Sequence, residues 1–299
     1  MMDLRQLRYF VGVVTAGSFN KAAEQLHVAQ PALSRQIKAL EDDLGVQLLF
    51  RTSHGVHVTD AGRRLRELAD YLLRSAENVR TEVQSVANEP SGKVVVGLPP
   101  SLSTLVTPRL IEAAQQRFPR ISIHVIEGLS VFLVDWIELG RIDIAVLTDP
   151  RQDHSIERRD LGYEDMVLVG TPDKIDTLRK SVTVRDMDRP DVVISNGFLR
   201  VMQPWYEAAG AKQRFAMELD SIPIIKSMVE RGIYVTIVPY AMVHREVVSG
   251  LLRALPFDNP RIQRHLVLAN SSRRPVTQSM VAIGELIAAE IALIPKTFD

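Results

Sequence analysis

The stretch AQPALSRQIKALEDDLG, residues 29–45, has the pattern of an amphipathic helix. Its apolar face is expected to pack on its own domain, and its polar face is available to contact another molecule. Its apolar residues recur every three or four positions, at Leu33, Ile37, Leu40 and Leu44, and predict one buried face. Pro31 suits the first turn, because the amide hydrogen that proline lacks has no helical partner there. Gly45 is suited to end the helix. The polar residues Gln30, Ser34 and Arg35 lie away from the apolar stripe.

The preceding residues predict two further helices. Apolar spacing favours a first helix up to Val14, and Gly17 stops it. Ser18 is a suitable N-cap for a second helix ending near Leu26. A helix, a tight break and a next helix opening at Gln30 have the spacing of a helix-turn-helix, whose second helix enters the DNA major groove. Glutamine and arginine can each make paired hydrogen bonds to base edges. A helical bundle that contacts only proteins remains the alternative.

Charge supports the DNA interpretation locally. The whole chain carries 36 basic and 36 acidic residues, a formal net charge of zero. Residues 1–66 carry nine basic and six acidic side chains, a net charge of +3. The segment RTSHGVHVT, residues 51–59, predicts a short hairpin turning at Gly55, and its His54 and His57 add positive character near phosphate.

Composition excludes several other classes. The chain has 299 residues, 46% hydrophobic and 24% charged, which indicates a globular protein of more than one domain. It contains no cysteine, so disulfides, thiol nucleophiles and cysteine zinc sites are excluded. Neither a signal peptide nor a run of about 20 apolar residues is found, so we expect a cytoplasmic protein without membrane contact. No phosphate-binding loop, dinucleotide fingerprint, nucleophile elbow or zinc-protease motif occurs. We therefore expect no enzyme, no cofactor and no metal.

Residues 60–88 predict one long helix. Its apolar residues step by three or four and form a seam close to that of a coiled coil, made of Ala61, Leu65, Leu68, Leu72, Ala76, Val79, Val83 and Val86. The opposite face is charged. Packing on its own domain is one interpretation. Pairing with a second copy of the chain fits better, because nothing nearby in sequence can cover so long a stripe.

After the linker NEPSGK, residues 88–93, apolar strands alternate with helices. Strands are predicted at 93–98, 121–128, 142–147, 166–170, 192–195, 214–219, 234–239 and 265–270, with a last helix at 275–293. Continuous apolar strands indicate a parallel sheet buried on both faces. The chain is expected to form two α/β lobes, crossing near residues 161–166 and returning near 263–267.

The N-terminal residues resemble the LysR-type transcriptional regulators. The resemblance rests on Ser18, the Ala-Ala pair, Gln-Pro-Ala-Leu-Ser at 30–34, the Leu-Gly pair at 44–45, Arg51 and the Thr-Asp-Ala-Gly motif at 59–62, and it covers essentially the whole chain. The segments VVVGLPPSLSTLVTPRL, residues 94–110, and GRIDIAVL, residues 140–147, are more specifically similar to the nitrogen assimilation control branch of this family. Ala29 departs from the family, which usually has Ser or Thr there, so a capping hydroxyl is missing.

The resemblance implies a multidomain α/β protein. Its expected parts are a winged helix-turn-helix domain (1–59), a linker and dimerisation helix (60–88), a hinge (89–93) and a two-lobed effector-binding domain like the periplasmic binding proteins (94–299). Lobe I would comprise 94–163 and 267–299, and lobe II 164–266. The family also implies promoter DNA and RNA polymerase as partners, and a homodimer or homotetramer. The expected DNA-binding residues are Ser18, Gln30, Pro31, Ala32, Ser34, Arg35, Lys38, Arg51, His54 and Thr59.

An effector site is expected where the strands end, because ligands in open α/β sheets bind beyond the carboxyl ends of strands, near helix starts. Hydroxyls and free N–H groups there suit a small anion such as a carboxylate. The expected effector-binding residues are Pro100, Ser101, Leu102, Ser103, Thr104, Ser130, Thr148, Ser195, Phe198 and Tyr234. Tyr234 replaces a glycine usual in the family, so it either narrows the pocket or packs on its lobe.

The sequence therefore predicts a sequence-specific DNA-binding transcriptional regulator under allosteric control by a small-molecule effector. One alternative is a constitutive regulator whose cleft is filled by side chains such as Tyr234 or Phe198. Another, from a different class, is a cytoplasmic solute-binding α/β protein.

Overall fold

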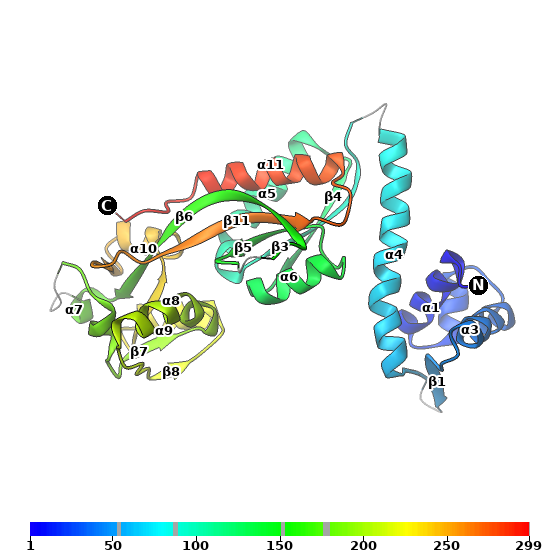
Figure 1. Ribbon diagram of the computed structural model, residues 1–299, viewed down its shortest axis with the longest axis horizontal. Helices are drawn as coiled ribbons and strands as arrows, with labels where there is room; N and C mark the ends of the chain where they lie inside the picture. The colour runs from blue at the N-terminus through cyan, green and yellow to red at the C-terminus, as the bar shows by residue number, and fades with distance from the viewer. Residues whose placement is uncertain (53–54, 86–88, 151–152, 176–179, 299) are drawn as a thin grey trace. The chain divides into compact units, whose positions relative to one another are not determined.

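The computed structural model describes residues 1–298 except 53–54, 86–88, 151–152 and 176–179 (Figure 1). The chain divides into two compact units, one of Met1–Gly92 with Glu138–Arg141 and one of Lys93–Ile137 with Ile142–Asp299. None of the described helices is long and apolar enough to cross a membrane.

Three helices and a hairpin form the N-terminal part of the first unit. They are α1 (Leu4–Ala16), α2 (Phe19–Gln25), α3 (Gln30–Leu44), β1 (Leu49–Thr52) and β2 (Gly55–Val58), and the two strands pair antiparallel. The predicted helices are confirmed. Gly17 and Gly45 end α1 and α3 with φ of 63° and 68°, a left-handed conformation that glycine adopts without strain.

The apolar stripe of α3 packs into the core of this domain. Leu33, Ile37 and Leu40 are buried there beside Phe10 of α1. Leu44 was expected in the same stripe, and that expectation is wrong, because its side chain is 38% exposed in the last turn before Gly45.

The long helix is confirmed as α4 (Asp60–Ser85). Ala69 on α4 is fully buried, whereas Leu68, Leu72 and Val79 are 37%, 37% and 64% exposed. Val86 lies outside the described residues, and the side chain of Val83 is not described. The described part of the seam is therefore open along one side of the single chain.

The second unit consists of one sheet covered by helices. Its strands are β3 (Gly92–Leu98), β4 (Ile121–Glu127), β5 (Ile144–Thr148), β6 (Ile156–Gly170), β7 (Val192–Ile194), β8 (Met217–Glu218), β9 (Val235–Pro239), β10 (Arg253–Pro256) and β11 (Gln263–Ser271). Its helices are α5 (Pro100–Arg117), α6 (Ser130–Glu138), α7 (Pro172–Ile175), α8 (Asn196–Ala209), α9 (Ile222–Glu230), α10 (His244–Val248) and α11 (Gln278–Ala292), with short 3₁₀ turns η1 (Val184–Met187) and η2 (Tyr240–Met242).

Within the described residues, the sheet has nine strands in the order β4-β3-β5-β11-β6-β9-β7-β8, with β10 paired to β6. The expected parallel pairing holds for β3 with β5 and for β7 with β8 and β9. The expectation of a purely parallel sheet is wrong, because β11 and β6 run antiparallel to each other and to their other neighbours. These two strands carry the chain from one lobe to the other and back, which requires opposite directions.

Figure 1 shows β6 and β11 side by side along the second unit. β6 is a single strand of 15 residues, of which the predicted strand at 166–170 is only the last part. Its register with β11 shifts between Leu266 and Val267, opposite Gly162 with φ of 92°. One apolar core surrounds Val96, Leu110 and Ile287, and another surrounds Leu168, Ile194 and Ile237, so each lobe has its own core.

Candidate functional site

The polar face of α3 is the first candidate site. Arg35 and Lys38 are exposed, and Gln30 and Ser34 are partly exposed, while Leu33 and Ile37 on the other side are buried. This is the arrangement that the sequence predicts for a helix reading a DNA groove. Pro31 is exposed and Ala32 partly buried in the first turn, where Ala29 makes no side-chain cap.

A hollow lies beside this face of α3. Ser34 and Lys38 line it together with Glu41. The Glu41 carboxylate accepts the N–H groups of Leu48 and Leu49 at 2.8 and 3.0 Å, which ties the entry of the β1–β2 hairpin to the helix. Glu41 therefore supports the hairpin, and the exposed charged groups at this hollow are Lys38 and Asp42.

Thr59 holds the start of α4. Its hydroxyl donates to the carbonyl of Gln47 over 2.7 Å and accepts the N–H of Gly62 over 3.0 Å. A Cβ atom at Gly62 would collide with the Leu48 carbonyl oxygen, so this contact requires glycine. Because its hydroxyl is already bonded on both sides, Thr59 acts in placing α4.

The remaining expected DNA-binding residues are Ser18, Arg51 and His54. Ser18 occupies the N-cap position of α2 but makes no side-chain cap bond. Arg51 pairs with Val56 in the hairpin by its backbone, and its side chain is not described. His54 lies outside the described residues. His57 is exposed and its ring stacks on Phe50 with centroids 5.4 Å apart.

The start of α5 brings together the first group of expected effector residues. Ser101 and Ser103 are 4% and 5% exposed, Leu102 belongs to the lobe core, and Thr104 points to solvent. Pro100 is partly buried in the first turn. Among the residues that the structure describes, no side chain caps α5, and Leu102 and Ser103 both donate their N–H groups to the Pro99 carbonyl. The Ser103 hydroxyl lies 3.3 Å from that of Thr107 within the helix.

Ser130 and Thr148, which the sequence analysis predicts for one site, are in contact. Their hydroxyls are 2.9 Å apart, and the Thr148 N–H donates to the Ser130 hydroxyl over 2.8 Å. This pair links the start of α6 to the end of β5. At the next position, burial raises the pKa of the Asp149 carboxyl above its usual value, against the opposing effect of a hydrogen bond from the His265 N–H.

The start of α8 is already capped. The Ser195 hydroxyl accepts the N–H of Phe198 at 3.3 Å, and Asp220 accepts the N–H of Asn196 at 2.9 Å. Phe198 is buried in the core of lobe II, and Tyr234 is partly buried against the same core. These contacts favour the interpretation of Tyr234 as an aromatic residue packing on its lobe.

Two charged residues that the sequence reading did not select lie between these helix starts. Arg264 of β11 and Glu164 of β6 are 2% and 0% exposed and face each other in register. Arg264 Nη1 donates to the Ser101 hydroxyl over 2.9 Å, and its guanidinium lies 5.9 Å from the centre of the Phe198 ring. The guanidinium therefore touches the starts of both α5 and α8. β6 and β11 each carry several other polar or charged residues, so no sequence signal singled out this pair.

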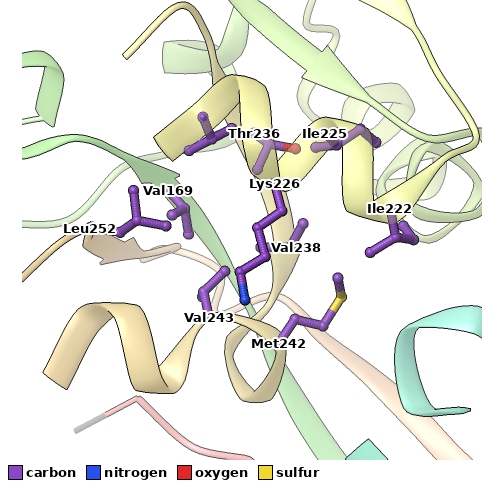
Figure 2. A pocket seen from close by; sticks show the side chains of 10 residues that line it. Val169, Ile222, Ile225, Lys226, Thr236, Val238, Met242, Val243 and Leu252 are labelled. Atoms are coloured by element: carbon purple, nitrogen blue, oxygen red, sulfur yellow. The ribbon is translucent and has the colours of Figure 1, made fainter. Parts of the chain in front are cut away.

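A separate small cavity lies inside lobe II (Figure 2). Apolar side chains such as Ile225 and Val238 and the stem of Lys226 line it, and its volume is about 10 Å³. That is room for about one water molecule, so this cavity is too small for an effector. Lys226 places its ammonium 2.6 Å from Glu246.

Comparisons with known proteins agree over the whole chain. Residues 4–63 match the bacterial regulatory helix-turn-helix proteins of the lysR family, and residues 87–292 match the LysR substrate binding domain. The nitrogen assimilation regulatory protein nac of Escherichia coli K12 is 30% identical over 297 residues, covering 97% of this chain and 96% of that protein. The dual regulator OxyR of E. coli K12 is 28% identical over 294 residues, covering 97% and 96%.

Solved structures show the same fold. A full-length variant of OxyR from Pseudomonas aeruginosa superposes with a TM-score of 0.73 at 24% identity, covering 99% of this chain and 97% of that one. Full-length CbnR in complex with its target DNA has a TM-score of 0.71 at 23% identity, covering 97% of this chain and 100% of that one.

Proposed function

This chain belongs to the family of LysR-type transcriptional regulators, and on that premise we propose which of its residues read DNA and which receive the effector. Members of this family regulate transcription, bind promoter DNA and small-molecule effectors, and form oligomers. The solute-binding alternative is thereby set aside. The proposal places this regulator in the cytoplasm, where promoters and RNA polymerase are found, and assigns it no catalytic reaction.

For DNA, Gln30, Ser34 and Arg35 read base edges, while Lys38 contacts phosphate. Their outward position on α3, opposite buried Leu33, supports this assignment. Phosphate contacts set the register of the helix on the duplex, and base contacts supply the sequence preference. Ser18, Arg51 and His54 remain additional candidates.

For assembly, two chains pair through residues 60–88, which contain α4. The open apolar seam of α4, with Val79 64% exposed, supports this pairing. Two paired chains present two α3 helices to an interrupted palindrome, and two such dimers form a tetramer. Residues 89–93 serve as the hinge, followed by lobe I (94–163 and 267–299) and lobe II (164–266).

For the effector, the binding site lies between the lobes and the start of α5 is its central contact. The single observation that carries this is the convergence of Ser101 and Phe198, from different lobes, on one buried guanidinium. A ligand that changes this contact alters how the lobes close. Such a ligand controls DNA binding only if it binds the two arrangements with different affinity.

The test is a melting-temperature screen of metabolites on the full chain, followed by gel shifts on an operator selected from random duplexes. A ligand of the folded state raises the melting temperature by mass action. We expect Ser101→Ala to remove the shift and leave operator binding intact, whereas the exposed control Ser249→Ala keeps both. A ligand response that survives Ser101→Ala contradicts the proposed site, and an absence of any ligand response supports the constitutive alternative.

A further inference from the structure

Arg264 and Glu164 form a buried ion pair on the two strands that join the lobes. Arg264 Nε donates to Glu164 Oε2 over 2.8 Å, and Nη2 approaches the same oxygen to 2.6 Å. Glu164 Oε1 has no hydrogen-bond partner among the described residues. Removing two charges from water is costly, and well-packed apolar residues usually replace such pairs without loss of stability. Stability alone therefore does not explain a buried ion pair in which one carboxylate oxygen has no described hydrogen-bond partner.

The same guanidinium determines what the Ser101 hydroxyl can do. A serine hydroxyl has one proton to donate and accepts through its lone pairs. Because Ser101 Oγ accepts from Arg264 Nη1 at 2.9 Å, its own proton is directed elsewhere. Hydrogen bonds to a charged donor are stronger than neutral ones and polarise the acceptor, so the hydroxyl becomes a better donor.

The start of α5 adds a second donor and no competing acceptor. Pro100 has no N–H, and Leu102 and Ser103 donate their N–H groups to the Pro99 carbonyl. No hydrogen bond of the Ser101 N–H is found in the part of the chain that the structure describes. The first turn contains no acidic residue and no capping side chain. The positive end of an 18-residue helix therefore remains open here, whereas the start of α8 is capped by Ser195 and Asp220.

We propose that Arg264 is the specificity-determining residue of the effector site. It holds Ser101 as a hydrogen-bond donor, so the effector contacts the start of α5 with an acceptor that carries negative charge, a carboxylate. Glu164 neutralises Arg264 in the absence of the effector and keeps the guanidinium aimed at Ser101. This inference rests on the proposed effector site, and Arg264 acts on the ligand through Ser101 as a positioning residue.

The experiment uses matched probes that differ only in charge. Succinate and benzoate are compared with succinamide and benzamide in melting-temperature titrations of the full chain. The variants are Arg264→Lys, which keeps the charge, and Glu164→Gln combined with Arg264→Gln, which removes both charges without leaving one buried alone. A single cooperative melting transition in the absence of any probe verifies that the domain carrying each variant is folded.

We expect at least one carboxylate, and neither amide, to raise the melting temperature of the wild type. The double variant should weaken that binding roughly tenfold or more, and Arg264→Lys should restore part of it. Equal shifts with amides, no shift with either carboxylate, or full carboxylate binding by the folded double variant would each overturn the role of Arg264. A carboxylate shift that depends on Arg264 but survives Ser101→Ala would instead refute the proposed contact at α5.

Discussion

Arg66 of α4 donates a hydrogen bond to the Thr15 hydroxyl over 2.9 Å and thereby joins the long helix to α1. The same Nη1 also donates to the Val11 carbonyl over 3.1 Å, and Nε bonds Asp70 at 2.7 Å. The side chain is 29% exposed, so these contacts lie partly out of water. Because α3 packs on α1, this contact relates the direction of α4, the proposed pairing helix, to that of α3, the proposed DNA-reading helix.

The Arg66→Ala variant should make DNA binding by the paired chains less dependent on the distance between the two half-sites of the operator. Two hydrogen bonds worth about 1 kcal/mol each are lost from the contact between α4 and α1. Gel shifts with operators lengthened or shortened by one base pair would measure the effect. Arg64→Ala is the control, since among the described residues Arg64 has only a surface ion pair with Glu67 and should change nothing. An unchanged spacing preference in Arg66→Ala would refute the role of this contact.

Arg35→Ala should weaken DNA binding at one base position of each half-site. A paired hydrogen bond to a base edge contributes about 1–3 kcal/mol of discrimination, so binding to the preferred sequence falls while binding to the substituted sequence changes little. Lys38→Ala is the matched comparison on the same face and should weaken all sequences uniformly, with the salt dependence reduced by about one ion. Titrations against operator variants at several salt concentrations separate the two. A uniform loss for Arg35→Ala would assign it to phosphate.

Ala29→Ser should stabilise the start of α3. Ala29 has the extended conformation of an N-cap residue, with φ of −68° and ψ of 131°, but no side-chain oxygen that could also accept the Ala32 N–H, which donates to the Ala29 carbonyl over 2.9 Å. A capping hydroxyl contributes about 1 kcal/mol, which slows amide exchange of the first turn roughly fivefold. Hydrogen exchange of the intact protein measures this. The exposed mid-helix control Ala39→Ser should act in the opposite direction, because serine is a weaker helix former than alanine. Equal effects at both positions would contradict the capping argument.

Asp165 should make the effector domain sensitive to acid. Its carboxylate is 3% exposed and accepts hydrogen bonds from Arg261, from Gln263 at 2.9 Å and from the Phe298 N–H at 2.8 Å. Burial acts to raise the pKa of Asp165, but these bonds outweigh it and hold the pKa below its usual value of 3.8. A lowered pKa means that the stabilisation is complete above 3.8 and is lost as the pH falls through the lower folded value.

We therefore expect Asp165→Asn to lower the melting temperature at neutral pH and to reduce its decline between about pH 5 and pH 3. Asp258→Asn, at an exposed position, serves as the control and should retain the wild-type decline. If Asp165→Asn also retains it, the acid sensitivity arises elsewhere in the chain.

Local patterns predicted most of the N-terminal domain because its helices are amphipathic and its breaks are glycines. Gly17 and Gly45 end helices at left-handed positions, and Leu33, Ile37 and Leu40 are buried as their spacing requires. Leu44 departs from this pattern because the helix ends before the core can cover it. The direction in which neighbouring strands pair was harder to predict from sequence. An apolar run such as 166–170 has the same composition whether its neighbour runs parallel or antiparallel to it.

The amino-acid sequence by itself determined the family, the two faces of the helix that we propose reads DNA, and the alternation of strands and helices. These depend on spacing along the chain, which sequence displays directly. Only the tertiary structure decided which polar groups meet. Ser101, Glu164 and Arg264 are separated by up to 163 residues and come together because β6 and β11 pair in register between the lobes. A hydroxyl at a helix start has the same sequence signature whether it is a cap, as Ser195 is, or a partner of a buried cation, as Ser101 is.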